Sequence, residues 1–130
     1  ASAPIAAIAA AQPAHPAVAW LAVACDLPFL SDDTVSHLVA RRGVHPVTAY
    51  RSAHDGLPEP LCAIYEPATR AAIVEFIGTG KYCPRKFIIG TGVPLVGLPE
   101  PAALDNVNTP EELAAAAARL AGQAGPGFRA

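Results

Sequence analysis

Residues 18–30 read VAWLAVACDLPFL and contain a strong strand signal followed by an acidic residue. Its first seven residues, 18–24, are apolar without alternation, which is typical of a central parallel strand that is covered on both faces. Asp26 follows this run almost directly. In doubly wound sheets the binding crevice opens at the carboxyl ends of the strands. The stretch therefore predicts a buried strand that presents an acidic side chain at a binding site.

Helix and strand signals alternate along the rest of the chain. They predict helices over residues 4–12, 31–42, 67–77 and 110–121, strands over 18–24, 47–50, 61–65 and 94–98, and one or two helical turns over 84–89. Such alternation indicates an α/β domain with a mostly parallel sheet. Because the chain begins with a helix that normally follows a strand, we expect the fold to be incomplete at its N-terminus.

Length and composition exclude several classes of protein. The chain has 130 residues, 52% of them hydrophobic and 15% charged, so it suits one domain with a core rather than a disordered segment. A net charge of −2 argues against nucleic-acid binding, which needs a field of Lys and Arg. No uncharged apolar run approaches the roughly 18 residues of a membrane span. We therefore expect a soluble domain that acts on something small.

The three cysteines form no recognisable pattern. Cys25, Cys62 and Cys83 are odd in number and lack the paired spacing of a zinc site. The expected state is buried, reduced thiols in a reducing cytoplasm. Cytoplasmic localisation follows as a prediction.

Asp26 has two interpretations on position alone. An Asp in a loop often orders the turn through its own backbone. The alternative is a ligand for a hard cation, since Mg²⁺ commonly takes one or two protein oxygens and completes its shell with water and substrate phosphates. A single carboxylate at a crevice suits that role better than general acid–base work, which needs a partner.

A second informative segment is LDNVNTPEEL, residues 104–113. Asn106 and Asn108 alternate around Val107, so in an extended segment both amides lie on one side. They precede a predicted helix N-terminus, capped by Thr109, which attracts anions. Either Asn alone equally well caps a turn. Together with Asp26, however, the two amides favour a site for a cation and a phosphate.

Four segments, taken in order, resemble those of the MobA-like nucleotidyltransferases, which include the molybdenum cofactor guanylyltransferases. They are APIAAI (3–8), CDLPFL (25–30), EPLCAIY (59–65) and NVNTPEEL (106–113). Ala3 and Ala6 stand where the family usually has glycine. The resemblance covers residues 2–121 and implies a Rossmann-like three-layer α/β/α fold of the glycosyltransferase-A type. Residues 122–130, which contain three glycines and a proline, are predicted to form a flexible tail.

The resemblance also implies an activity and its residues. The reaction would be Mg²⁺-dependent transfer of GMP from GTP to molybdopterin, with Asp26 binding Mg²⁺ and the nucleotide phosphates. Asn108, together with Asn106, would contribute to catalysis and to binding on the side of the metal or the pterin phosphate. Cytidylyl relatives typically carry Asp-x-Asp at this place, so the two asparagines favour guanylyl transfer.

In the family, the loop that ends at Pro60 borders the binding site of the acceptor, molybdopterin. Lys86 lies in the basic segment GKYCPRKF (80–87), which also holds Lys81 and Arg85. This segment either receives a phosphate oxygen or is simply a solvated basic loop. Pro60 and Lys86 are therefore predicted acceptor-binding residues.

One family feature has no counterpart in this sequence. The glycine-rich loop LAGG-x-S-x-R-M-G-x-DK, which cradles the triphosphate, is not matched. We therefore expect the C-terminal portion of a transferase, inactive or nearly so by itself, that self-associates or is covered by an N-terminal segment or another chain. The alternatives are a non-catalytic domain that binds a partner or the pterin, and a related cytidylyl or sugar-phosphate nucleotidyltransferase.

Overall fold

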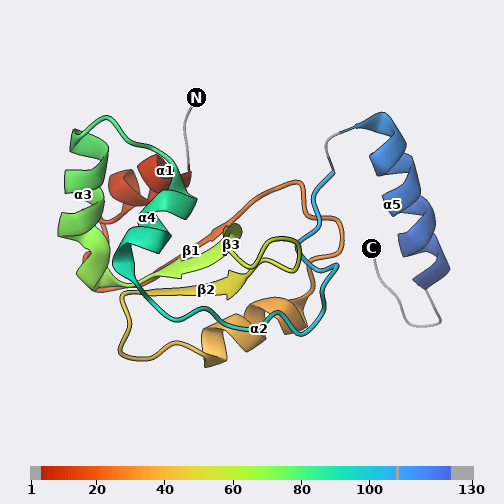
Figure 1. Cartoon of the computed structure of the whole chain (residues 1–130), viewed down its shortest axis with the longest axis horizontal. Helices are drawn as coiled ribbons and strands as arrows, with labels where there is room; N and C mark the ends of the chain where they lie inside the picture. Colours follow the sequence, from red (N-terminus) through yellow and green to blue (C-terminus); the bar gives the residue numbers. More distant parts are fainter. Residues whose placement is uncertain (1–3, 108, 124–130) are drawn as a thin grey trace.

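The computed structural model describes residues 4–107 and 109–123. Its elements are, in order, α1 (Pro4–Ala11), β1 (Trp20–Val23), α2 (Asp32–Ala40), β2 (Val47–Arg51), β3 (Pro58–Tyr65), the 3₁₀ helix η1 (Pro67–Thr69), α3 (Arg70–Gly78), α4 (Pro84–Thr91) and α5 (Pro110–Gln123) (Figure 1). Within these residues no helix combines the length and the apolar character needed to cross a bilayer.

The described strands form one sheet in the order β1-β3-β2, and both of its ladders are antiparallel. The prediction of a mostly parallel sheet was therefore wrong for these ladders. For β2 and β3 the reason is their short connection, because a parallel return needs a crossover of a dozen or more residues. β1 and β2 both run opposite to β3, which lies between them, and so run in the same direction as each other.

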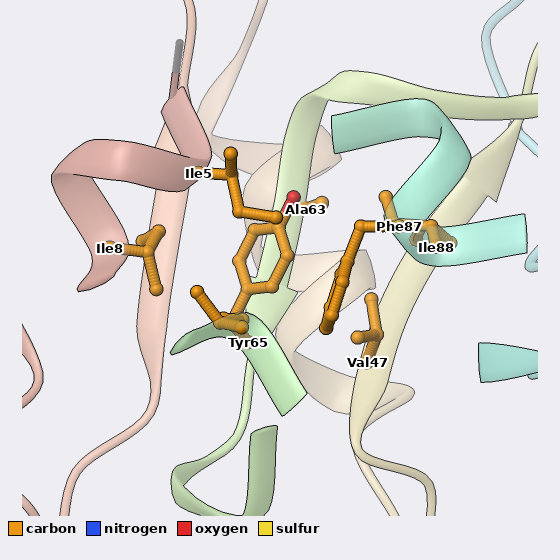
Figure 2. Packing of buried hydrophobic residues seen from close by; sticks show 9 residues of the cluster. Ile5, Ile8, Val47, Ala63, Tyr65, Phe87 and Ile88 are labelled. Atoms are coloured by element: carbon orange, nitrogen blue, oxygen red, sulfur yellow. The ribbon is translucent and has the colours of Figure 1, made fainter. Parts of the chain in front are cut away.

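Helices cover both faces of this sheet, which gives the predicted three layers (Figure 1). On one face a core cluster joins α1, α3 and α4 to the sheet, and Figure 2 shows Tyr65 of β3 among Ile5, Ile8 and Phe87. On the other face Leu38 of α2 packs in a second cluster with side chains of β2 and β3. Alternation along β2 and β3 divides their apolar side chains between the two clusters, whereas β1 contributes only Trp20 and Ala22, to the first cluster.

β1 differs from the central, doubly covered strand that its apolar run predicted. Its only ladder among the described residues is with β3, and its side chains alternate between half-buried and exposed. Leu21 and Val23 are 37% and 42% exposed. A run without alternation shows only that both faces are apolar, and it does not show that both are covered.

The segment after α4 also differs from its prediction. The expected strand 94–98 is reduced to a parallel bridge between Val96 and Tyr50, held by hydrogen bonds from Arg51 N–H to Val96 O (2.8 Å) and from Val96 N–H to Ala49 O (2.9 Å). In contrast, the one or two turns predicted at 84–89 form the full helix α4. It ends at Gly92, whose φ of 69° suits glycine.

α5 begins at its predicted cap. The hydroxyl of Thr109 accepts a hydrogen bond from the N–H of Glu112 (3.1 Å), as the sequence TPEE indicates. The Arg119 guanidinium lies 4.3 Å from the centre of the Phe29 ring, so the helix contacts the turn after β1. Residues 122 and 123, assigned to a tail from sequence, continue the helix, and 124–130 lie outside the described residues.

The three thiols are free, but only Cys62 is buried. The expectation of burial was wrong for Cys25 and Cys83, which are exposed. Cys25 lies in the turn after β1, and Cys83 immediately precedes α4. Both are loop positions, where an apolar neighbourhood in sequence does not bring packing partners.

Candidate functional site

Asp26 lies in a turn that begins just after β1. Its side chain is half-buried, and no hydrogen bond or ion pair involves its carboxylate within the described part of the chain. The sequence predicted this position of Asp26, just after the end of a strand. The carboxylate is thus free to accept a ligand from outside the chain.

The late Asn-Val-Asn segment meets this turn. The backbone N–H of Val107 donates to the carbonyl oxygen of Asp26 over 3.1 Å. Asn106 is exposed at the same place, whereas Asn108 lies outside the described residues. The structure therefore brings Asp26 together with the segment that carries the predicted amides.

Asn106 also lines a cavity of about 330 Å³. Its walls come from the β2–β3 connection, the start of β3, the first turn of α4 and residues 104–106, so two predicted acceptor residues, Pro60 and Asn106, share it. The cavity and Asp26 flank the same short segment. Three chain segments far apart in sequence thus meet at one place.

Charged side chains hold these walls together. His54 Nε2 lies 2.9 Å from Asp105 Oδ1, which ties the hairpin connection to the 104–106 segment. Arg85 Nε donates to the carbonyl oxygen of Pro58 (3.0 Å), and its Nη1 lies 4.0 Å from Asp55 Oδ2. The N–H of Leu57 donates to Asp55 Oδ1 (3.0 Å) and lowers the pKa of that carboxyl.

Glu59 is the buried acid of the cavity, with 7% of its surface exposed. Its Oε1 accepts a hydrogen bond from the N–H of Leu61 (3.2 Å). Burial raises the pKa of Glu59, because the charged form loses its water, while this hydrogen bond and the charge of Arg85 oppose the change. A perturbed acid in a cavity is a candidate functional group.

Lys86 does not line this cavity. It lies on α4, where two further hollows are lined by Phe76, Lys81 and Lys86. Its neighbour Arg85 faces the cavity of Pro60 and Asn106 instead. The assignment of Lys86 to acceptor binding remains a prediction.

Sequence reasoning gave Glu59 no role, although it begins the quoted segment EPLCAIY. It also did not foresee the contact between His54 and Asp105. Glu59 stood in the predicted loop before the strand 61–65, so no local signal distinguished it, and only the structure begins β3 at Pro58. No local pattern predicts the contact between His54 and Asp105, because the two side chains belong to separate loops.

The residues present suit a magnesium ion. Among residues 4–107 and 109–123, no three His, Cys, Asp or Glu side chains form a group that could hold a metal. Mg²⁺ nevertheless needs only one or two protein carboxylates when substrate phosphates and water complete its shell. The half-buried carboxylate of Asp26 meets that requirement.

Known proteins resemble the chain over most of its length. Residues 1–92 match the model of the MobA-like NTP transferase domain. A "Molybdenum cofactor biosynthesis bifunctional protein" from Synechocystis sp. is 31% identical over 110 residues, which cover 84% of this chain and 32% of that protein. A "Probable molybdenum cofactor guanylyltransferase" from Trichormus variabilis is 33% identical over 96 residues, which cover 72% of this chain and 46% of the relative.

A solved structure shares the fold. It is a molybdopterin-guanine dinucleotide biosynthesis protein A from Archaeoglobus fulgidus, with a TM-score of 0.74 and 21% sequence identity. The match covers 92% of this chain and 64% of that chain. The architecture is therefore an incomplete α/β nucleotidyltransferase fold, and the chain spans about a third to a half of the length of its curated relatives.

Proposed function

The chain belongs to the MobA-like NTP transferase domain family, and we propose that its protein transfers GMP from GTP to molybdopterin in molybdenum cofactor synthesis. The proposal agrees with the name of the guanylyltransferase relative from Trichormus variabilis. The observation that carries it is the hydrogen bond between Val107 N–H and Asp26 O, which joins the acidic turn to the Asn-Val-Asn segment.

In this reaction a phosphate oxygen of molybdopterin attacks the α-phosphorus of GTP. The new P–O bond forms as the bond between the α-phosphorus and its bridging oxygen to the β-phosphate breaks, and pyrophosphate leaves. No protein nucleophile is needed. Catalysis then depends on holding the two substrates in line and on stabilising the charge that develops.

Asp26 is the residue proposed to hold Mg²⁺, and the ion would supply charge neutralisation for the triphosphate. Its half-buried position strengthens the attraction between the carboxylate and a cation, because nearby protein lowers the local dielectric. Asn106 and Asn108 are proposed to orient phosphate or ribose oxygens beside it. Their roles depend on the connection of this segment to the turn of Asp26.

The acceptor is proposed to occupy the cavity between Pro60 and Asn106. Asp105 and Asn106 line this cavity, and the next residue, Val107, is hydrogen-bonded to the turn of Asp26. Such a position would bring the acceptor phosphate next to the donor.

The test uses the protein as its gene encodes it. GTP labelled at the α-phosphate is incubated with molybdopterin and Mg²⁺, and labelled dinucleotide is measured, with CTP as the competing donor. The proposal expects label transfer from GTP and release of pyrophosphate. Binding of molybdopterin without transfer would instead favour a non-catalytic pterin-binding domain, and preferential transfer from CTP would favour a cytidylyltransferase.

A further inference from the structure

We propose that Glu59 binds the 2-amino-4-oxopyrimidine edge that pterin and guanine share, inside the cavity next to Asn106. This inference deepens the proposed function, because it states which part of a substrate enters this cavity. It rests on the position, the charge balance and the hydrogen bonding of the residues that line the cavity.

The side chains that line the cavity carry a net negative charge. Three carboxylates, of Asp55, Glu59 and Asp105, face one permanent cation, Arg85, and one histidine, His54. Both basic groups already have partners, because Arg85 donates to Pro58 O and lies near Asp55, while His54 contacts Asp105. A phosphate would therefore meet net repulsion here, whereas a group rich in N–H donors would be attracted.

Glu59 has an oxygen available for such donors. Within the described residues its only hydrogen bond is the one that Oε1 accepts from Leu61 N–H at 3.2 Å. A carboxylate accepts several hydrogen bonds, and a buried one that lacks them is costly. A ligand with two parallel N–H donors would replace the water that burial has removed.

The 2-amino-4-oxopyrimidine edge offers this pair of donors. Its ring N–H and its exocyclic amino group lie side by side and match the two oxygens of a carboxylate, as a guanidinium does. The cavity also has apolar wall residues, Pro60, Leu61 and Leu104, against which a flat ring can pack. Its volume of about 330 Å³ lies in the range of small-molecule sites.

Calorimetric titration of the full chain tests the proposal with three ring compounds. Pterin and guanosine carry the amino group, whereas lumazine has a carbonyl oxygen in its place. We expect pterin or guanosine to bind, and lumazine to bind at least about tenfold more weakly, since its oxygen would face the carboxylate. Whichever of pterin and guanosine binds more tightly identifies the substrate whose ring enters the cavity.

A variant connects this preference to the residue. E59Q keeps the oxygen that Leu61 uses but adds an N–H₂ group facing the ligand, so we expect about tenfold weaker binding of the preferred ring. E75Q, the same change at an exposed position on α3, should leave binding unchanged. If E59Q does not fold, the comparison with lumazine on the unmodified chain still decides the question.

Equal affinity for lumazine and pterin would overturn the proposal, and so would unchanged binding by folded E59Q or no binding of either amino compound. Displacement of the ring by inorganic phosphate would overturn it as well, because the cavity would then be an anion site. The outcome is separable from the proposed function. Ring discrimination without GMP transfer would refute only the transferase proposal, and transfer without discrimination would refute only the role of Glu59.

Discussion

The backbone N–H of Val107 donates to the carbonyl oxygen of Asp26 over 3.1 Å, although one residue follows β1 and the other precedes α5. This bond uses main-chain atoms only, so it leaves the Asp26 carboxylate available. It also fixes Asn106, next to Val107, at the boundary between the acidic turn and the cavity. The donor and acceptor sides of the proposed site are thus joined through one short segment.

Replacement of Asp26 by Asn should abolish most of the proposed transfer while the fold is kept. The amide has lost the charge that attracts Mg²⁺, so we expect label transfer by the gene-encoded protein to fall by about 100-fold or more. Asp32→Asn is the matched control, because Asp32 is exposed in the first turn of α2. Equal turnover of the two variants would remove Asp26 from the site.

Two buried tyrosines should respond differently to loss of the hydroxyl. Tyr50 Oη donates to Thr34 O (2.7 Å) and therefore accepts from His37 Nδ1 (2.9 Å), so Tyr50→Phe should lower the free energy of unfolding by about 1–2 kcal/mol. Tyr65 is equally buried, but its hydroxyl has no hydrogen-bond partner among the described residues. Tyr65→Phe should therefore change stability by less than about 0.5 kcal/mol.

Urea unfolding of both variants measures this difference. Because each substitution removes the same atom from a fully buried ring, the pair separates the hydrogen bonds from the packing. An equal loss of stability in the two variants would contradict the assigned contacts.

The fold should lose stability in alkaline solution. Burial raises the pKa of Tyr50 and of Tyr65 to about 12, and that of Cys62 to about 11. The unfolded chain deprotonates these groups at lower pH than the folded chain does, so the unfolded state is favoured as pH rises above about 9. The effect should continue up to about pH 12, where the folded groups also ionise.

The measurement is the free energy of unfolding at pH 8, 9, 10 and 11. Tyr65→Phe removes one of the three groups and should flatten the decline above pH 10. A stability that is constant over this range would show that these side chains are not buried in the folded chain.

The open edge of β1 should promote self-association of this chain. β1 pairs on one side with β3, and on its other edge it has no ladder among the described residues, while Leu21 and Val23 are partly exposed. Unpaired strand edges with apolar side chains associate with other chains. Sedimentation should show species larger than the monomer, and Leu21→Lys should reduce them; a single monomeric species would contradict this expectation.

Local signals explain what could be predicted from the sequence. Ser31 accepts a hydrogen bond from Thr34 N–H at the start of α2, and Thr109 caps α5, both as their sequences indicate. The turn at Asp26 follows from the end of an apolar run. These features depend on neighbours within a few residues, so the sequence is sufficient to specify them.

The features that could not be predicted from the sequence depend on pairing between distant parts of the chain. β3 lies between β1 and β2 and pairs antiparallel with both, and alternation along one strand contains no information about its neighbour. The same limit applies to the candidate site. Glu59, Arg85 and Asp105 meet only after the hairpin, α4 and the late segment have packed together.

One divalent cation is proposed to bind where Asp26 and the segment at Val107 meet. Mn²⁺, a paramagnetic substitute for Mg²⁺, can be titrated into the isotope-labelled protein in the presence of GTP while its backbone amide signals are followed. We expect the amide signals of Asp26 and Val107 to broaden first, and the Asp26→Asn substitution to prevent this broadening. Early broadening at α3 and α4 around Lys86, with Asp26 and Val107 unaffected, would contradict it.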